Sequence, residues 1–91
     1  ILNIDELVFY LIKYLVRYYP EALIARYGSS LEGLEEAIQV FDGIGRRRGC
    51  IMKGGNIDYT KTAKIILDDF RSGRLGAITL EHVPTTASEK E

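Results

Sequence analysis

The N-terminal part of the chain places apolar residues at the spacing of an α-helix. Its apolar positions, three or four residues apart, are Ile4, Leu7, Val8, Leu11, Ile12 and Leu15. Asn3 and Glu6 have the spacing of a capping box, so we expect this helix to begin at about Ile4. Pro20 fits only the first turn of a following helix, so the first helix should end near Tyr19. A helix this apolar on nearly all sides is central in a bundle or covered by another domain.

Two more helices are expected on either side of a pair of serines. The second helix should run from Pro20 to Tyr27 and end at Gly28, which suits a left-handed C-cap. The third is expected over residues 31–48, with Ser29 and Glu32 as its capping box. The apolar stripe that predicts it consists of Leu34, Ala37, Ile38, Phe41 and Ile44.

A fourth helix is expected from Tyr59 to Ser72, with Asp58 as its N-cap and Gly73 at its end. Residues 77–81 indicate a short extended piece. Residues 84–91 are polar and small, which is typical of a disordered tail. These patterns together predict an all-α fold: a small bundle of four to five helices.

Length and composition favour one helical domain over residues 1–83. A single cysteine, Cys50, excludes an internal disulfide, and with only one histidine, His82, we expect no zinc site. The apolar run over 4–19 carries two basic residues and is too short to span a bilayer, so no membrane partner is expected. The chain starts at Ile1 rather than Met, without a signal peptide, which suggests part of a longer, cytoplasmic protein.

Charge is unevenly distributed along the chain, although the total is only −1. Residues 1–42 carry three basic and seven acidic side chains, a net charge of −4, and residues 65–91 carry three and five, a net charge of −2. Residues 43–64 carry six basic side chains against Asp58 alone, a net charge of +5. This distribution indicates a localised anionic partner rather than general affinity for polyanions.

The candidate RNA-binding residues are the six cations of this block: Arg46, Arg47, Arg48, Lys53, Lys61 and Lys64. Arginine and lysine side chains of this density suit phosphate binding. The arginines alternatively complement the negative end of their own helix dipole. The pair Gly54-Gly55 forms either a backbone nest for an anion or a plain tight turn.

The sequence offers no catalytic residues. His82 has no nucleophile or carboxylate partner that the sequence identifies, and Asp68 and Asp69 point about 100° apart on a helix, so we read both as exposed helix charges. The glycine-rich run 43–49 lacks the Lys-Ser/Thr of a phosphate loop, so no nucleotide-binding residues are assigned.

Tyr10, Tyr14 and Tyr18 recur at every fourth position of the first helix and form a possible interaction face. Packing against this domain or a neighbouring one is the preferred interpretation. Stacking on nucleobases is the alternative.

The run from Arg46 to Glu81 resembles the C-terminal signature of the circularly permuted GTPases of the YlqF/RbgA type, which act late in assembly of the large ribosomal subunit. The segment YYPEALIARYG also resembles the second helix of that family. Gly43 and Gly45 depart from the family's helix-favouring residues, which questions only the rigidity of the third helix. The residues that match the signature are Ile44, Arg46, Arg48, Gly49, Cys50, Gly54, Gly55, Asp58, Tyr59, Arg71, Ser72, Gly73, Leu75 and Gly76.

The resemblance implies a parent protein that hydrolyses GTP with magnesium through an N-terminal domain that this chain lacks. The chain contains no Asn-Lys-x-Asp motif and no phosphate loop, so it should need no cofactor and be no enzyme by itself. The C-terminal domain of this family is similar to helical RNA-binding antiterminator modules, and the implied role is docking on the large ribosomal subunit and its RNA. The alternative is a regulatory domain that packs on its own GTPase domain or on a ribosomal protein.

Overall fold

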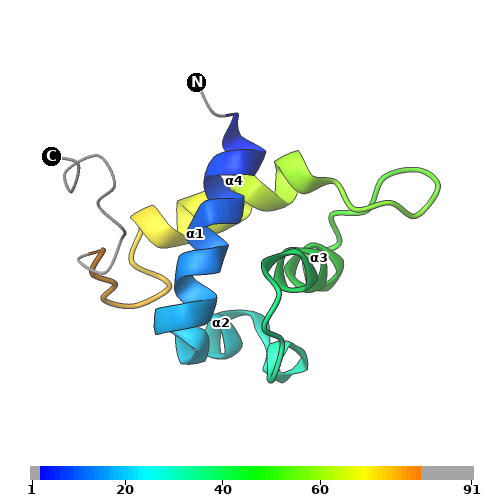
Figure 1. The fold of residues 1–91 in the computed structure, drawn as a ribbon. Coiled ribbons are helices and arrows are strands. Elements are labelled where there is room, and N and C mark those ends of the chain that lie inside the picture. Colours follow the sequence, from blue (N-terminus) through cyan, green and yellow to red (C-terminus); the bar gives the residue numbers. More distant parts are fainter. Residues whose placement is uncertain (1–2, 81–91) are drawn as a thin grey trace, which may run out of the picture.

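Four α-helices and one short 3-10 helix form the part of the chain that the computed structural model describes, residues 3–80 (Figure 1). They are α1 (Ile4–Tyr18), α2 (Pro20–Tyr27), η1 (Ser29–Leu31), α3 (Ala37–Arg47) and α4 (Tyr59–Arg71). Within that range no strand forms, and one isolated antiparallel bridge joins Ile51 to Ile57. The predicted all-α bundle is confirmed.

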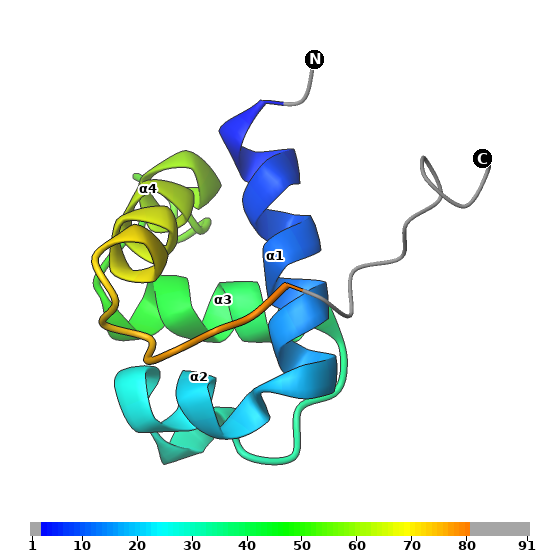
Figure 2. The same ribbon diagram turned by 90° about the vertical axis from the view of Figure 1, so that its left-hand side faces the viewer.

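Helix α1 is the central element of the bundle. It packs against α2, α3 and α4 (Figures 1 and 2), and its residues Val8, Ile12 and Leu15 have no solvent exposure. The apolar surface on nearly every side of α1 is therefore buried largely within this domain, as expected of a central helix.

The start of α1 is stabilised by the predicted capping box. The side chain of Asn3 accepts a hydrogen bond from the backbone N–H of Glu6 at 2.9 Å. In return, the backbone N–H of Asn3 donates to the Glu6 carboxylate at 3.3 Å. Pro20 occupies the first turn of α2, where its missing N–H costs nothing. The first two helices thus begin and end within a residue of where the sequence predicts.

The prediction for the third helix is wrong at its N-terminus. Residues 29–31 form the 3-10 helix, the chain then turns, and α3 begins only at Ala37. Gly33, with φ +82°, interrupts the helical path, and no side chain caps η1, so the capping box predicted for Ser29 is absent. Leu31 still reaches the core with 4% exposure. Leu31 therefore contributes to the core from η1, although it is not part of α3.

Helix α3 approaches its neighbours closely at its two glycines. A Cβ atom at Gly45 would lie 2.8 Å from Cγ2 of Ile57 and 2.9 Å from Oγ1 of Thr62. A Cβ atom at Gly43 would lie 2.7 Å from Cδ2 of Leu31. The glycines that weaken α3 as an isolated helix thus allow it to pack tightly.

The fourth helix begins as predicted, because the Asp58 carboxylate accepts a hydrogen bond from the backbone N–H of Lys61 at 3.0 Å. It ends at Arg71, one residue before the predicted Ser72, and Gly73 follows with φ +83°.

The chain then runs as irregular backbone over residues 76–80 and crosses α1 (Figure 2). There the Tyr14 hydroxyl donates to the carbonyl of Thr79, and the backbone N–H of Thr79 donates to the Tyr19 hydroxyl at 3.2 Å. Glu81, His82 and the predicted tail 84–91 lie outside the described residues.

Candidate nucleic-acid interface

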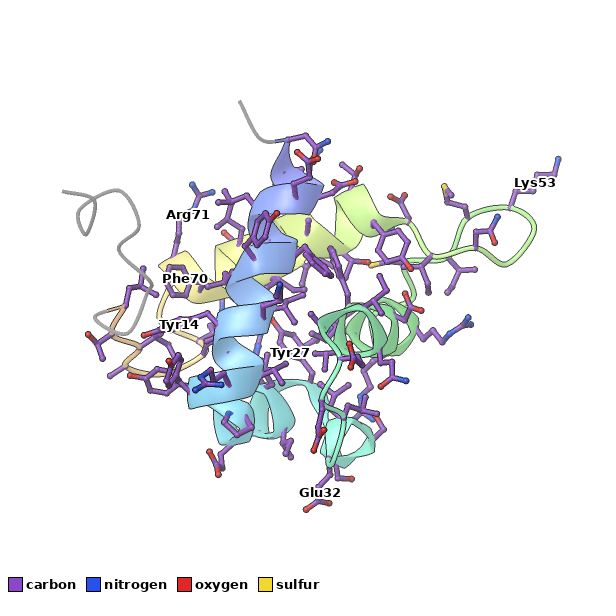
Figure 3. The ribbon with its side chains drawn as sticks, viewed as in Figure 1. Tyr14, Tyr27, Glu32, Lys53, Phe70 and Arg71 are labelled. Atoms are coloured by element: carbon purple, nitrogen blue, oxygen red, sulfur yellow. The ribbon has the colours of Figure 1, made fainter. Side chains whose placement is uncertain are left out.

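All six predicted RNA-binding cations are exposed. Arg46 and Arg47 form the last turn of α3, and Arg48 is its C-cap. Lys53 lies at the tip of the connection between α3 and α4, the most outlying labelled side chain in Figure 3. Lys61 lies in the first turn of α4, and Lys64 is one turn further. The structure therefore places five of the six along one path, from the end of α3 to the start of α4, and Lys64 beyond it.

The connection that carries Lys53 is a tight hairpin over residues 51–57, called here the 51–57 hairpin. The backbone N–H of Met52 donates to the carbonyl of Asn56 at 2.7 Å, and that of Gly55 donates to the carbonyl of Met52 at 2.9 Å. Gly54 and Gly55 have φ values of +96° and +90°, which other residues rarely adopt. Since the Gly55 amide is used within the turn, the tight-turn interpretation of this glycine pair fits better than an anion nest.

The three arginines point to different neighbours. The Arg48 guanidinium lies 5.2 Å from the centre of the Tyr27 ring and donates to the carbonyl of Arg26 at 3.4 Å. The Arg47 guanidinium lies over Gly28, where an added Cβ would be 2.9 Å from its Cζ. Arg47 and Arg48 thus contact the C-terminal end of α2 while remaining exposed.

Arg46 lies on the other side, near the hydroxyl of Tyr59, which donates to the Asp42 carboxylate. That hydrogen bond is the largest cause that raises the pKa of Tyr59 to about 12, and burial is the second largest. The positive charge of Arg46 opposes this shift. The Tyr59 ring also packs edge-on against Phe41, with ring centres 5.0 Å apart. This pair fixes the start of α4 on α3.

No carboxylate neutralises these cations in an ion pair within residues 3–80. The ion pairs there join Arg26 to Asp69 and Arg74 to both Asp68 and Asp69. The only acidic side chain of the block, Asp58, faces the N–H groups at the start of α4. The surface thus keeps a local excess of positive charge, and charge of one sign concentrates anions near it.

Asp69 is not the exposed helix charge that the sequence suggested, since only 4% of its side chain is exposed. The Arg26 guanidinium donates to its two carboxylate oxygens at 3.1 Å each, and the Tyr27 hydroxyl donates at 2.7 Å. Arg74 reaches the same carboxylate at 3.5 Å. The neighbouring Asp68, with 71% exposure, fits the prediction. These contacts tie α2 to α4.

The electrostatics of this cluster favour the ionised carboxylate. Burial alone raises the pKa of Asp69, but hydrogen bonds from Arg26 and Tyr27 and the positive charges of Arg26 and Arg48 outweigh burial and lower it. Burial and the hydrogen bond to Asp69 raise the pKa of Tyr27, so its hydroxyl stays protonated. The ionised Asp69 carboxylate therefore forms ion pairs with Arg26 and Arg74.

The glycine-rich run 43–49 lies at the end of α3 and in the turn that follows it. Residues 43–47 of the glycine-rich run belong to α3, so their backbone is helical and forms no phosphate loop. Among residues 3–80, no three histidine, cysteine, aspartate or glutamate side chains lie close enough to hold a metal ion. Within residues 3–80, no helix has the length and apolar character needed to cross a membrane.

The three tyrosines of the possible interaction face do not share one open surface. Tyr14 is only 8% exposed and lies under the 76–80 segment, whereas Tyr10 and Tyr18 are 55% and 37% exposed. Basic neighbours on α1 lie over the exposed rings: the Lys13 amine is 5.7 Å from the Tyr10 ring centre, and the Arg17 guanidinium is 5.3 Å from that of Tyr18. A partner would meet Tyr10 and Tyr18.

No family model matches this chain, but several curated proteins do, under the name ribosome biogenesis GTPase A. The protein of Bacillus cereus is 42% identical over 81 residues, which cover 89% of this chain and 27% of the relative. Those of Priestia megaterium and Bacillus pumilus are 41% and 40% identical, with the same coverage of this chain and 28% of theirs. The chain spans little more than a quarter of these relatives, and the resemblance predicted from the sequence is confirmed.

Proposed function

Because this chain is homologous to one part of the ribosome biogenesis GTPases, we propose that it is the ribosome-docking domain of such a GTPase. In this proposal it binds RNA of the large ribosomal subunit, late in assembly and in the cytoplasm. The six cations of residues 43–64 contact phosphates. The remainder of the parent protein, outside this chain, binds and hydrolyses GTP with magnesium.

One observation carries the RNA-binding part of this proposal: six exposed cations are concentrated in residues 43–64, and none forms an ion pair within residues 3–80. Exposed lysine and arginine side chains are common on protein surfaces, but six of them beside a single carboxylate leave a local excess of positive charge. A phosphate backbone supplies the missing negative charge, and binding to it releases counterions.

Replacing Lys53 and Lys61 together with glutamate is expected to weaken binding to large-subunit ribosomal RNA at least about tenfold. The slope of affinity against salt should also fall by about 1 for each lost phosphate contact. These two lysines are preferred to the arginines because no hydrogen bond or ring contact of their side chains supports the fold. Fluorescence anisotropy at two salt concentrations measures both quantities, and circular dichroism checks folding.

The matched control replaces Lys13 and Arg17 with glutamate, which changes the net charge equally. Both residues are exposed on α1 and line a hollow with Glu35 and Glu36, away from the basic block. Because they also contact the Tyr10 and Tyr18 rings, circular dichroism checks the folding of this variant as well. We expect this control to keep most of the wild-type affinity. Absence of RNA binding at low salt, or equal losses in both variants, would contradict the proposal.

A second candidate function is contact with the parent's GTPase domain or with a ribosomal protein, favoured by the exposure of Tyr10 and Tyr18. Replacing both with alanine is expected to reduce stimulation of the parent GTPase by the large subunit, while affinity for naked RNA stays unchanged. Measuring GTP hydrolysis and RNA binding on the same variant separates the two functions. Loss of RNA affinity would instead assign these rings to the RNA.

A further inference from the structure

Two large apolar side chains lie exposed within the basic block of residues 43–64. Ile51 and Met52, at the base of the 51–57 hairpin, are 43% and 48% exposed, and Lys53 follows them directly. The other large apolar side chains exposed within residues 3–80 lie outside the basic block: Leu7, Tyr10, Tyr18, Ile38 and Leu80. A loop that served only to present charge to phosphates would not need apolar residues here.

The hairpin holds these side chains on a rigid base. Ile57, which pairs with Ile51 across the hairpin, is buried with 6% exposure, and Cys50 is fully buried. The backbone N–H of Cys50 donates to the carbonyl of Gly45, and that of Asp58 donates to the carbonyl of Cys50, each at 2.8 Å. A preorganised loop loses little conformational freedom when a ligand binds, so ordering the loop takes little from the binding free energy of its side-chain contacts.

The chemistry around Met52 selects between kinds of RNA. Phosphates are present in every RNA, whereas the faces of bases are accessible only where bases are unpaired, in loops, bulges and ends. The major groove of paired RNA is too deep and narrow for side chains to read. A thioether makes favourable contacts with aromatic rings and adapts to their shape. An apolar pair flanked by cations therefore fits an unstacked base beside its own phosphates.

We propose that the 51–57 hairpin holds Met52, with Ile51 beside it, against an unpaired nucleobase, while Lys53 binds a neighbouring phosphate. The inference rests on the proposed RNA-docking function and adds to it a preference for single-stranded loops over duplexes. The surrounding charge favours RNA over a protein partner at this place, since Asp58 is the only carboxylate of residues 43–64.

The test compares two RNAs with equal numbers of phosphates, a stem–loop with unpaired loop bases and a fully paired duplex. Met52→Ala is expected to weaken stem–loop binding about threefold to tenfold, the size of a lost sulfur–aromatic contact. Duplex binding and the salt dependence of both complexes should not change. Lys53→Ala should weaken both complexes and lower the salt slope by about 1.

Ile38→Ala is the matched control, because Ile38 is 46% exposed but lies beside Glu35 and Glu36 on another surface. It should leave both affinities unchanged. A second readout uses the fact that Met52 is the only methionine. Bound stem–loop RNA should slow its oxidation by peroxide, followed by mass spectrometry, and the duplex should protect it less.

If the wild-type chain binds neither RNA, the proposed function fails, and this inference fails with it. If it binds RNA but Met52→Ala matches wild type, or weakens the duplex equally, the inference alone is overturned. Stem–loop-specific loss together with protection of Met52 from oxidation supports it.

Discussion

Replacing Asp69 with alanine is expected to lower the free energy of unfolding by about 2–4 kcal/mol, because the change leaves buried polar partners without their acceptor. Tyr27, which is only 1% exposed, loses the hydrogen bond that its hydroxyl donates to Asp69. The Arg26 guanidinium loses both of its bonds but is a third exposed, so water partly replaces the carboxylate. Urea denaturation followed by circular dichroism measures the difference.

Asp68→Ala provides the control, one position away on the same helix. Its side chain is 71% exposed and pairs with Arg74 at 3.3 Å, and exposed pairs of this kind contribute less than about 1 kcal/mol. A loss of stability as large in Asp68→Ala as in Asp69→Ala would show that burial of Asp69 is not the cause.

The same carboxylate makes the stability depend on pH. Because the pKa of Asp69 is lower in the folded chain, ionised Asp69 stabilises the fold above its unfolded pKa of about 3.9. That contribution is lost as the pH falls through the folded pKa. The stability difference between wild type and Asp69→Asn should therefore shrink below about pH 4, and a difference constant down to acid pH would contradict the assignment.

Replacing Gly45 with alanine is expected to destabilise the chain by about 1–2 kcal/mol, although alanine is the better helix former. The added Cβ would lie 2.8 Å from Ile57 and 2.9 Å from Thr62, both buried. Overpacking costs about 1–3 kcal/mol. Because both contacted side chains are buried, we expect a cost of about 2–3 kcal/mol, which exceeds the gain of about 1 kcal/mol in helix propensity. Thermal and urea unfolding of the variant measure the net effect.

Gly43→Ala tests whether that loss comes from packing. The same helix-propensity gain applies, but the nearest atom is Cδ2 at the end of the flexible Leu31 side chain. Because Leu31 can move aside, we expect this variant to stay within about 1 kcal/mol of wild type. Equal destabilisation in both variants would contradict this, because it would mean that Leu31 yields no more easily than Ile57 and Thr62 do.

Features with local causes could be predicted from the sequence. The starts of α1 and α4 depend on Asn3 and Asp58, whose partners lie three residues away. The start of the third helix is predicted wrongly because Leu34 has the spacing of the helical stripe yet packs against the core from the irregular segment before α3. Spacing alone does not show that the helix begins only at Ala37.

The candidate site divides in the same way. Exposure of the six cations follows from their chemistry, since lysine and arginine are rarely buried without a partner. The environment of Asp69 could not be predicted, because its partners Arg26 and Tyr27 lie 43 and 42 positions earlier in the chain. Nor does the sequence show that Arg47 and Arg48 lie against α2.

The contacts of Asp69 also bear on how the two halves of the molecule are joined. They bind α2 to α4 directly, and at the far end of the bundle Thr60 donates to the carboxylate of Asp5 at 3.0 Å. The segments before and after the 51–57 hairpin are thus joined by hydrogen bonds at several separate places besides their apolar core. These contacts, and not only the peptide chain of the hairpin, therefore hold the two segments together. If a ligand displaces Gly54 and Gly55, the helices should move little.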